Sequence, residues 1–255
     1  MTVRTVRGAA IVRYLPFWLS LAAGAALWEI AGRESSPAFL VPLSTTLVRL
    51  WQMLIGGTLI AQTLDSAGLF LTGLLLSVLV GVPAGLLLAR TPTLRTALEP
   101  YIMILYATPM VALIPFILSL MGFGFVPKVL VVFLFGVFPI LYNTIEGGRS
   151  VKPEMIEVAR SFRSGEWALW RDVLLPHTLP FAMTGIRLAI GRCLVGMVAA
   201  EFLLSSNGLG QLIMSASQNF DTGGVFAAIF IICLIGLALM RLGLLLENRF
   251  AQWRI

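Results

Sequence analysis

Five long stretches of this 255-residue chain contain no charged side chain. An α-helix needs about 20 apolar residues to cross a bilayer, and several of these stretches reach or approach that length. Only 12% of the residues are charged, against ~25% in an ordinary soluble domain, so a soluble chain could not hide this much apolar surface. The sequence therefore predicts an all-α, polytopic membrane protein. The stretches are Tyr14–Trp28, Ser66–Ala89, Pro100–Pro127, Val129–Ile145 and Thr222–Met240.

About six transmembrane helices are predicted, each long enough to cross ~30 Å at 1.5 Å per residue. The fifth is the least apolar, because it contains Arg187, Arg192 and Glu201. Charged residues within a span face protein or a water-filled cavity, so we expect this helix to be shielded from lipid. The six helices are expected at residues 14–31, 66–90, 100–121, 126–146, 181–204 and 224–246.

The net charge of +6 is best interpreted as membrane topology. With both termini in the cytoplasm, twelve Arg and Lys residues fall on the inner side and three on the outer side. Basic residues concentrate in cytoplasmic loops, so this orientation is favoured, and an uncleaved first span is favoured over a signal peptide. The inner residues are Arg4, Arg7, Arg13, Arg90, Arg95, Arg149, Lys152, Arg160, Arg163, Arg171, Arg249 and Arg254; the outer ones are Arg33, Arg49 and Lys128.

Two connecting segments are too patterned to be simple turns. In residues 32–65, Pro42 precedes an amphipathic run through Leu47–Leu54, which predicts an interfacial helix on the outer face. In residues 147–180, Pro153 suits the first turn of a helix, and Ile156, Ala159 and Phe162 recur at helical spacing. Gly165 is expected to break this helix and Pro176 and Pro180 to end a second one. The segment is therefore predicted to be a helix-turn-helix hairpin outside the bilayer.

Several classes of chemistry lack their residues in this chain. There is no G-x-x-x-x-G-K-[ST] loop, so the chain cannot hydrolyse ATP through a P-loop. His177 is the only histidine, which excludes a histidine-based metal cluster and leaves an intramembrane enzyme dependent on a Ser–His pair. Cys193 and Cys233 lie in apolar stretches and are expected to be free thiols.

The 147–180 segment resembles a known motif. Glu157-Val158-Ala159 followed by Val173-x-Leu175-Pro176 is similar to the EAA signature, E-A-A-x3-G-x9-I-x-L-P, of the membrane subunits of bacterial ABC importers. Val158 replaces an alanine, and Arg163 stands where the signature has glycine. We expect Gly165 to supply the backbone freedom of the turn. The wider resemblance is to nitrate, sulfonate and taurine permeases, through FLVP at 39–42, GIRLAIGR at 185–192, AAEF at 199–202, NGLGQLI at 207–213, LENR at 246–249 and Trp253.

The resemblance implies a type I ABC importer fold, with residues 1–255 as one permease domain. Within it, residues 14–65 would form the N-terminal span and external segment, residues 66–246 the core, and residues 147–180 a cytoplasmic coupling hairpin. Implied partners are a second copy of the chain, two ATP-binding cassette subunits, an extracytoplasmic solute-binding protein and membrane lipid, but no nucleic acid. ATP and Mg would bind the ATPase subunits, and no cofactor, metal or catalytic residue is expected in this chain.

The hairpin would dock as a lever into a groove of the ATPase subunit. Its apolar face, formed by Ile156, Ala159, Phe162 and Trp167, would enter the groove, with Arg160, Arg163, Glu166 and Arg171 at the rim. The alternative is a hairpin that packs on the membrane surface. The coupling residues implied by the motif are Glu157, Val158, Ala159, Phe162, Arg163, Gly165, Leu175 and Pro176.

The translocation pathway is expected along the third and fifth spans. Pro109 breaks the third span, where Thr108 and Met110 could contact solute. Arg187 and Arg192 either attract an anion or bind carbonyls, a carboxylate or lipid phosphate. Glu201 is about 21 Å along the helix from Arg187, too far to pair with it, and is expected to be structural or to gate the pathway.

The expected function is therefore ATP-driven import of a small solute delivered by a binding protein. An anion such as a sulfonate, nitrate, taurine or an aromatic carboxylate is the leading class, although related permeases also carry thiamine precursors. The alternative from another class is a proton-coupled carrier or channel that uses Glu29 and Glu201.

Overall fold

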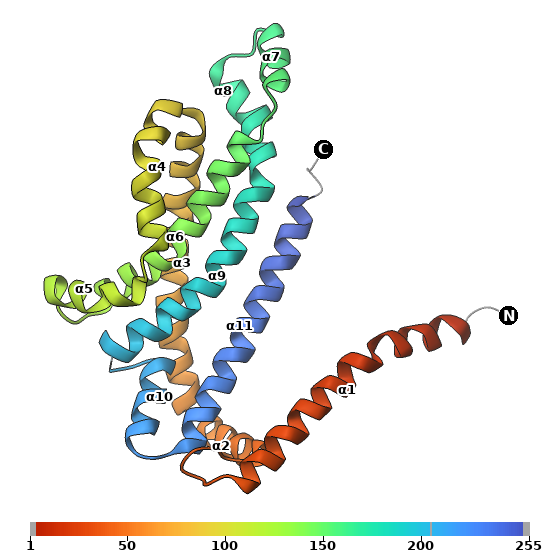
Figure 1. Ribbon diagram of the computed structural model, residues 1–255, viewed down its shortest axis with the longest axis vertical. Coiled ribbons are helices and arrows are strands. Elements are labelled where there is room, and N and C mark those ends of the chain that lie inside the picture. Colours follow the sequence, from red (N-terminus) through yellow and green to blue (C-terminus); the bar gives the residue numbers. More distant parts are fainter. Residues whose placement is uncertain (1–3, 205, 252–255) are drawn as a thin grey trace. The chain divides into compact units, whose positions relative to one another are not determined.

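The computed structural model describes residues 4–204 and 206–251, and every regular element within them is helical (Figure 1). Trp253 and Arg254, which the sequence analysis used, lie outside the described residues. The chain divides into two compact units. Unit 1 consists of the residues up to Ile60 and Leu212–Phe230, and unit 2 of Ala61–Gln211 and the residues from Ile231 onward.

Unit 1 contains α1 (Arg4–Glu34), α2 (Leu43–Ile55), most of α10 (Leu209–Gln218) and the first turns of α11 (Thr222–Ala251). Unit 2 contains nearly all of α3 (Thr58–Arg90) and the remainder of α11. Its other elements are α4 (Pro92–Ala107), the 3-10 turn η1 (Met110–Leu113), α5 (Ile114–Met121), α6 (Phe125–Arg149), α7 (Pro153–Ser161), α8 (Glu166–Leu169), the π-helical turn η2 (Trp170–Leu174) and α9 (Leu175–Leu204).

The prediction of an all-α, polytopic membrane protein is confirmed. Length and composition give four candidate spans, and a fifth if α4 and η1–α5, which meet at a 90° bend, form one broken span. This is fewer than the predicted six or so. The remaining predicted span corresponds to α9, a 30-residue helix that carries three charged side chains and is not among the candidates. The four candidates are Leu15–Glu34, Thr58–Arg90, Phe125–Arg149 and Thr222–Glu247.

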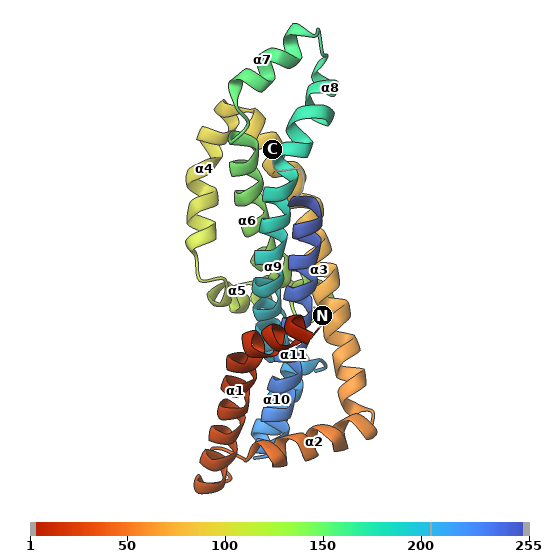
Figure 2. The ribbon, with the colours of Figure 1, turned by 90° about the vertical axis from the view of Figure 1, so that its right-hand side faces the viewer.

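The core of unit 2 forms where α6 packs along α9 (Figures 1 and 2). The main buried cluster takes side chains from both helices and from α3, and Val132 and Cys193 in it are fully buried. Burial of such side chains stabilises each by about 1.5–3 kcal/mol relative to exposure. The cluster consists of Leu69, Phe70, Val129, Val132, Ile190, Cys193 and Met197.

Glycines allow α3 to approach α6 closely, as the Gly81–Gly85 pattern predicts. A Cβ atom added to Gly85 would lie 2.6 Å from Cβ of Thr144, well inside normal contact. A Cβ atom at Gly136 would lie 2.6 Å from the hydroxyl of Ser77. That hydroxyl shares its one proton between the carbonyl of Gly73 on its own helix, 2.8 Å away, and the carbonyl of Phe133 on α6, 3.0 Å away. The small residues therefore also let a polar contact form between the two helices.

Two predicted boundaries are wrong, and one helix was missed. Pro176 and Pro180 do not end the second hairpin helix, because α9 begins at Leu175 and runs through both. Pro176 is the second residue of α9 and directly follows the π turn η2, where the helical hydrogen-bond pattern is already altered. Helix α10 was not predicted from the NGLGQLI stretch. The amphipathic helix predicted after Pro42 is confirmed as α2.

Replacing Gly85 by alanine should destabilise the α3–α6 contact. The new methyl group would overlap Thr144, and overpacking of this kind costs about 1–3 kcal/mol. Thermal unfolding of the detergent-solubilised protein measures the effect. Gly68→Ala, on the same helix with open space around the new methyl, is the matched control and should be neutral or slightly stabilising. Equal melting temperatures for the two variants would contradict the close approach.

Candidate functional site

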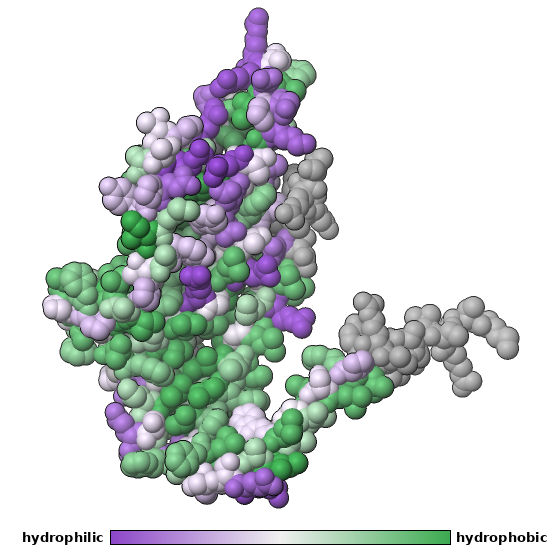
Figure 3. Space-filling model, in the orientation of Figure 1, coloured by the Kyte–Doolittle hydropathy of each residue, from purple (hydrophilic) through white to green (hydrophobic). Residues whose placement is uncertain are grey.

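The 147–180 segment forms the predicted helix-turn-helix hairpin at one end of unit 2 (Figure 2). Pro153 begins α7, as the sequence indicates. Helix α8 is a single turn, and the wider π turn η2 joins it directly to α9. Hydrophilic side chains cover much of this end of unit 2, whereas the surface over α5 is largely apolar (Figure 3).

The hairpin has its own small core, which divides its apolar residues into two sets. Ile156 and Ala159 pack on a buried cluster of Val151, Leu169 and Leu174. Both are half-buried, so they contribute to the core of the hairpin and also remain partly at its surface. Phe162 and Trp167 are far more exposed, at 81% and 75%, and Val158 and Leu175 are exposed as well. Glu157 is exposed and Pro176 half-buried.

The turn of the hairpin is made by Arg163 itself. Its φ angle is +56°, in the left-handed region, while Gly165 has an extended backbone with φ −68° and ψ 164°. The expectation that Gly165 supplies the turn is therefore wrong. The amide of Arg163 donates to the carbonyl of Arg160, and that of Ser164 donates to the carbonyl of Ala159, which closes the end of α7.

His177 lies at the base of the hairpin beside Ser150, with 3.1 Å between Nε2 and Oγ. This contact does not make a catalytic pair. The Ser150 hydroxyl donates its proton to the carbonyl of Gly147, 2.8 Å away, so it accepts from the imidazole and is not activated by it. Among the described residues no carboxylate orients the ring, which stacks on Phe181. The pair joins the end of α6 to the start of α9.

A cavity of about 370 Å³ opens where the broken span bends. Thr108 and Met110, at the break, line it together with Arg192 from α9. The hydroxyl of Thr108 donates to the carbonyl of Ile104, which also accepts the backbone amide of Thr108 where α4 ends. Aromatic and aliphatic side chains complete the lining: Tyr106, Val111, Leu134, Phe135 and Phe138.

Arg192 is the cation of this cavity. Its guanidinium carbon lies 4.7 Å from the centre of the Tyr106 ring, and Nη2 lies 3.3 Å from the Tyr106 hydroxyl. The ring of Tyr142 stacks on the ring of Tyr106, with 6.2 Å between the two ring centres. In the described part of the chain, no carboxylate lies within ion-pair distance of Arg192. An arginine held by aromatic rings without a carboxylate keeps donors for an anion.

Arg187 has a different environment, although it lies five residues earlier on α9. It forms an ion pair with Glu247 of α11 at 2.6 Å, and Thr184 donates a hydrogen bond to the same carboxylate. Its charge is therefore already matched, which fits the alternative that Arg187 binds a carboxylate on a neighbouring helix. Of the five predicted pathway residues, the cavity includes Thr108, Met110 and Arg192, whereas Arg187 and Glu201 lie outside its lining.

Glu201 is buried and holds the turn between α9 and α10. Its carboxylate accepts hydrogen bonds from the Ser66 hydroxyl at 2.7 Å and from the amide of Gly210 at 2.8 Å. Ser66 in turn accepts from the amide of Leu209, and Gln62 accepts from the amide of Gly208. These bonds satisfy the first amides of α10, which is a structural task for the Glu201 carboxylate.

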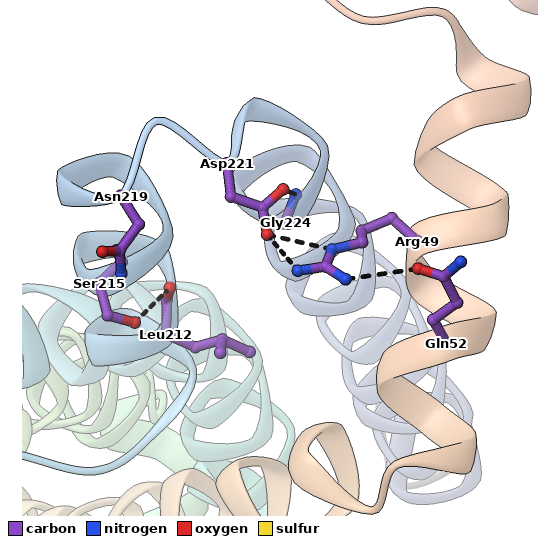
Figure 4. Close-up of polar contacts among 7 residues, drawn as sticks. All are labelled: Arg49, Gln52, Leu212, Ser215, Asn219, Asp221 and Gly224. Carbon is purple, nitrogen blue, oxygen red and sulfur yellow. Dashed lines mark hydrogen bonds and ion pairs between the residues drawn. The ribbon is translucent and has the colours of Figure 1, made fainter.

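Unit 1 has a comparable carboxylate in Asp221 (Figure 4). One of its oxygens accepts from the amide of Gly224 at the start of α11, and the other accepts from Nε and Nη2 of Arg49. Nη1 of Arg49 also donates to Gln52. These residues border a polar cavity of about 470 Å³ that Ser215 and Asn219 of α10 also line. The sequence analysis missed this cluster, because 172 residues separate Arg49 from Asp221.

Partial burial of Asp221 raises its pKa, but the hydrogen bonds from Arg49 and Gly224 outweigh this effect and hold the pKa below its ordinary value. The contact therefore stabilises the fold above the ordinary aspartate pKa of about 3.9, and this stabilisation is lost as pH falls through the lowered value.

An NMR titration of the Asp221 carboxyl should give a midpoint below about 3.9 that rises in Arg49→Met. Arg33→Met, which removes an arginine bound to Glu29, should leave the midpoint unchanged.

The geometry defines a class of protein. A bundle of apolar helices surrounds a cavity with one unmatched cation and carries a protruding hairpin, as expected for the membrane subunit of a transporter. In the part of the chain that the structure describes, no three His, Cys, Asp or Glu side chains could hold a metal ion.

Comparisons with known proteins define the family. Residues 81–252 match the family of binding-protein-dependent transport system inner membrane components. The putative aliphatic sulfonates transport permease SsuC of Bacillus subtilis is 32% identical over 90% of this chain and 84% of its own length. The riboflavin transport system permease RibX of Chloroflexus aurantiacus is 37% identical over 85% of this chain and 81% of its own length. The taurine transport system permease TauC of Escherichia coli is 30% identical, covering 89% and 84%.

A solved structure supports the fold. A chain of the MetNI methionine ABC transporter in an inward-facing conformation superposes with a TM-score of 0.62, covering 77% of this chain and 97% of that one at 16% identity. The chain thus has a type I importer fold and belongs to the family of binding-protein-dependent transport system inner membrane components. It is a multi-pass inner-membrane protein and an ABC importer permease for small solutes, not an enzyme. In this family, ATP hydrolysis resides in separate subunits.

Proposed function

We propose that this chain forms, as a homodimer, the membrane pathway of an ATP-driven importer, with two ATP-binding cassette subunits and an extracytoplasmic binding protein. The observation that carries the proposal is the hairpin, which has its own core and yet leaves Phe162 and Trp167 exposed. Large aromatic side chains at the tip of an ordered element are typical anchors of a protein interface. ATP and Mg bind the partner ATPase subunits in this scheme, and the chain itself needs no cofactor.

The orientation that fits this role has both termini and the hairpin in the cytoplasm. The distribution of basic residues supports it. When ATP closes the ATPase subunits, the hairpin follows, and the spans move between inward-open and outward-open states. Glu157, Val158, Phe162, Arg163 and Leu175 are exposed and available for contact with the ATPase. Ala159, Gly165 and Pro176 shape the hairpin in this scheme.

The solute that fits the cavity is a small organic anion. Arg192 provides one cation, and the aromatic and aliphatic lining suits an organic body better than a fully hydrated ion. A sulfonate, taurine or an aromatic carboxylate meets both requirements. Two of the relatives are permeases named for aliphatic sulfonates and for taurine, and these names agree with this class.

A proton-coupled carrier using Glu29 and Glu201 has less support. Glu29 pairs with Arg33 at 2.7 Å and accepts hydrogen bonds from the amide and hydroxyl of Ser44 at the start of α2. Glu201 is held by Ser66 and Gly210. Each carboxylate therefore satisfies the backbone at the beginning of a short helix, which is a structural task.

The hairpin proposal is tested by truncating its aromatic anchors. Phe162→Ala and Trp167→Ala should each reduce the amount of ATPase that co-purifies with the tagged permease by about tenfold or more, with a parallel loss of ATP-driven uptake. Phe123→Ala, which truncates a 76% exposed phenylalanine outside the hairpin, is the control and should retain both activities. Undiminished co-purification in both hairpin variants, or uptake that continues after ATP is exhausted, would contradict the proposal.

The role of Arg192 is tested by measuring how uptake depends on solute concentration. In Arg192→Gln the concentration of a sulfonate that gives half-maximal uptake should rise about tenfold or more, because a charge-assisted hydrogen bond is lost. Arg192→Lys keeps the charge and should lose less. Arg33→Gln removes an arginine outside the cavity and should leave this concentration unchanged. An unchanged value in Arg192→Gln would remove Arg192 from the solute pathway.

A further inference from the structure

Sequence and local geometry conflict at Arg163, which with Phe220 is one of two described non-glycine residues that have a positive φ angle. A left-handed backbone is readily adopted by glycine and is costly for a residue that carries a Cβ atom. Arg163 adopts it with φ +56°, although Gly165, two residues later, is extended and does not use its freedom. The hydrogen bonds that close α7 run through this residue, so the turn is built around the strained position. Such strain is concentrated at functional sites.

The side chain of Arg163 is exposed, and no carboxylate among the described residues pairs with it. Arg163 and Arg160 both project into solvent near the tip of the hairpin. Neither has a carboxylate within 4.0 Å among the described residues. Other hairpin charges are already paired: Arg171 with Asp172 at 2.8 Å, and Glu166 with Arg90 at 3.1 Å. The tip therefore presents two unmatched cations.

The two cations flank the exposed aromatic side chains. Phe162 directly precedes Arg163 in the chain, and Trp167 follows four residues later on α8. Glu154 lies in the first turn of α7 and Glu157 at its middle, one turn before Arg160, whereas Arg163 lies beyond the end of the helix. Apolar anchors beside charges of one sign form a surface that fits an apolar groove with an acidic rim, in which the charges select the partner.

We propose that Arg163, assisted by Arg160, is a specificity determinant that matches this permease to an ATPase subunit whose docking groove has an acidic rim. This inference rests on the proposed function, since it names the partner chemistry of the same hairpin. In this proposal the charge of Arg163 contributes to partner choice. Glycine would adopt the left-handed backbone without strain but would lack that charge. The backbone and the interface therefore make opposite demands on this one position.

Because the backbone favours glycine at this position and the interface favours arginine, one substitution should stabilise the turn and weaken ATPase binding. In Arg163→Gly, amide hydrogen exchange at the end of α7 should slow, because the turn loses its strain. The same variant should retain about three- to tenfold less ATPase when the tagged permease complex, purified from its native membrane, is washed at low salt. The difference from wild type should shrink as salt rises, because exposed charges are screened.

Three further variants separate charge from backbone. Arg163→Gln keeps a side chain in the strained turn but removes the charge, and should bind as weakly as Arg163→Gly. Arg163→Lys should stay within about twofold of wild type. Arg95→Gln removes an arginine of α4 that pairs with Glu99 outside the hairpin, and should bind as wild type does. Undiminished binding by both neutral Arg163 variants, or a loss that salt does not change, would overturn this inference alone. A wild-type permease that retains no ATPase at all would overturn the proposed function with it.

Discussion

The first amides of a helix have no intrahelical acceptor, and this chain repeatedly supplies that acceptor with a carboxylate. Glu29 on α1 accepts from the amide of Ser44 in α2, and Glu201 on α9 accepts from that of Gly210 in α10. Asp221 accepts from the amide of Gly224 in α11. The short helices can therefore begin where their amides would otherwise be unpaired. The clamp at Glu201 also explains a glycine: a Cβ atom on Gly208, whose φ is +105°, would collide with the carboxylate.

With those carboxylates assigned to structure, the charges left for transport are few. Arg187 and Arg192 lie on the same helix, and only the partner distinguishes them: Glu247 matches Arg187, and an aromatic ring holds Arg192. A cation that is matched within the fold orders the bundle, whereas one that is not offers its donors to a ligand. The break at Thr108–Pro109 brings the Tyr106 ring to Arg192, so the helix break and the cation belong to one feature.

Sequence reasoning succeeded where a local pattern carries the information. Apolar runs located the spans, Pro42 located α2, and Pro109 located the break. It failed where a distant contact decides. The charges on α9 could not be divided without seeing Glu247, and the pairing of Arg49 with Asp221 has no local signal. At the turn of the hairpin, glycine propensity pointed to Gly165, but the hydrogen bonds that end α7 placed the left-handed residue two positions earlier.

The same helix links the two parts of the proposed mechanism. Helix α9 starts at Leu175, at the end of the hairpin, and continues without interruption past Arg192 to Leu204. Seventeen residues separate Leu175 from Arg192, or about 26 Å of helix. A displacement of the hairpin by an ATPase would therefore pass along one rigid element to the cation of the cavity. Because α6 packs along α9, the movement would carry both helices. The bend between α4 and η1 is not packed along its length in this way, so the accompanying change of helix orientation would occur there.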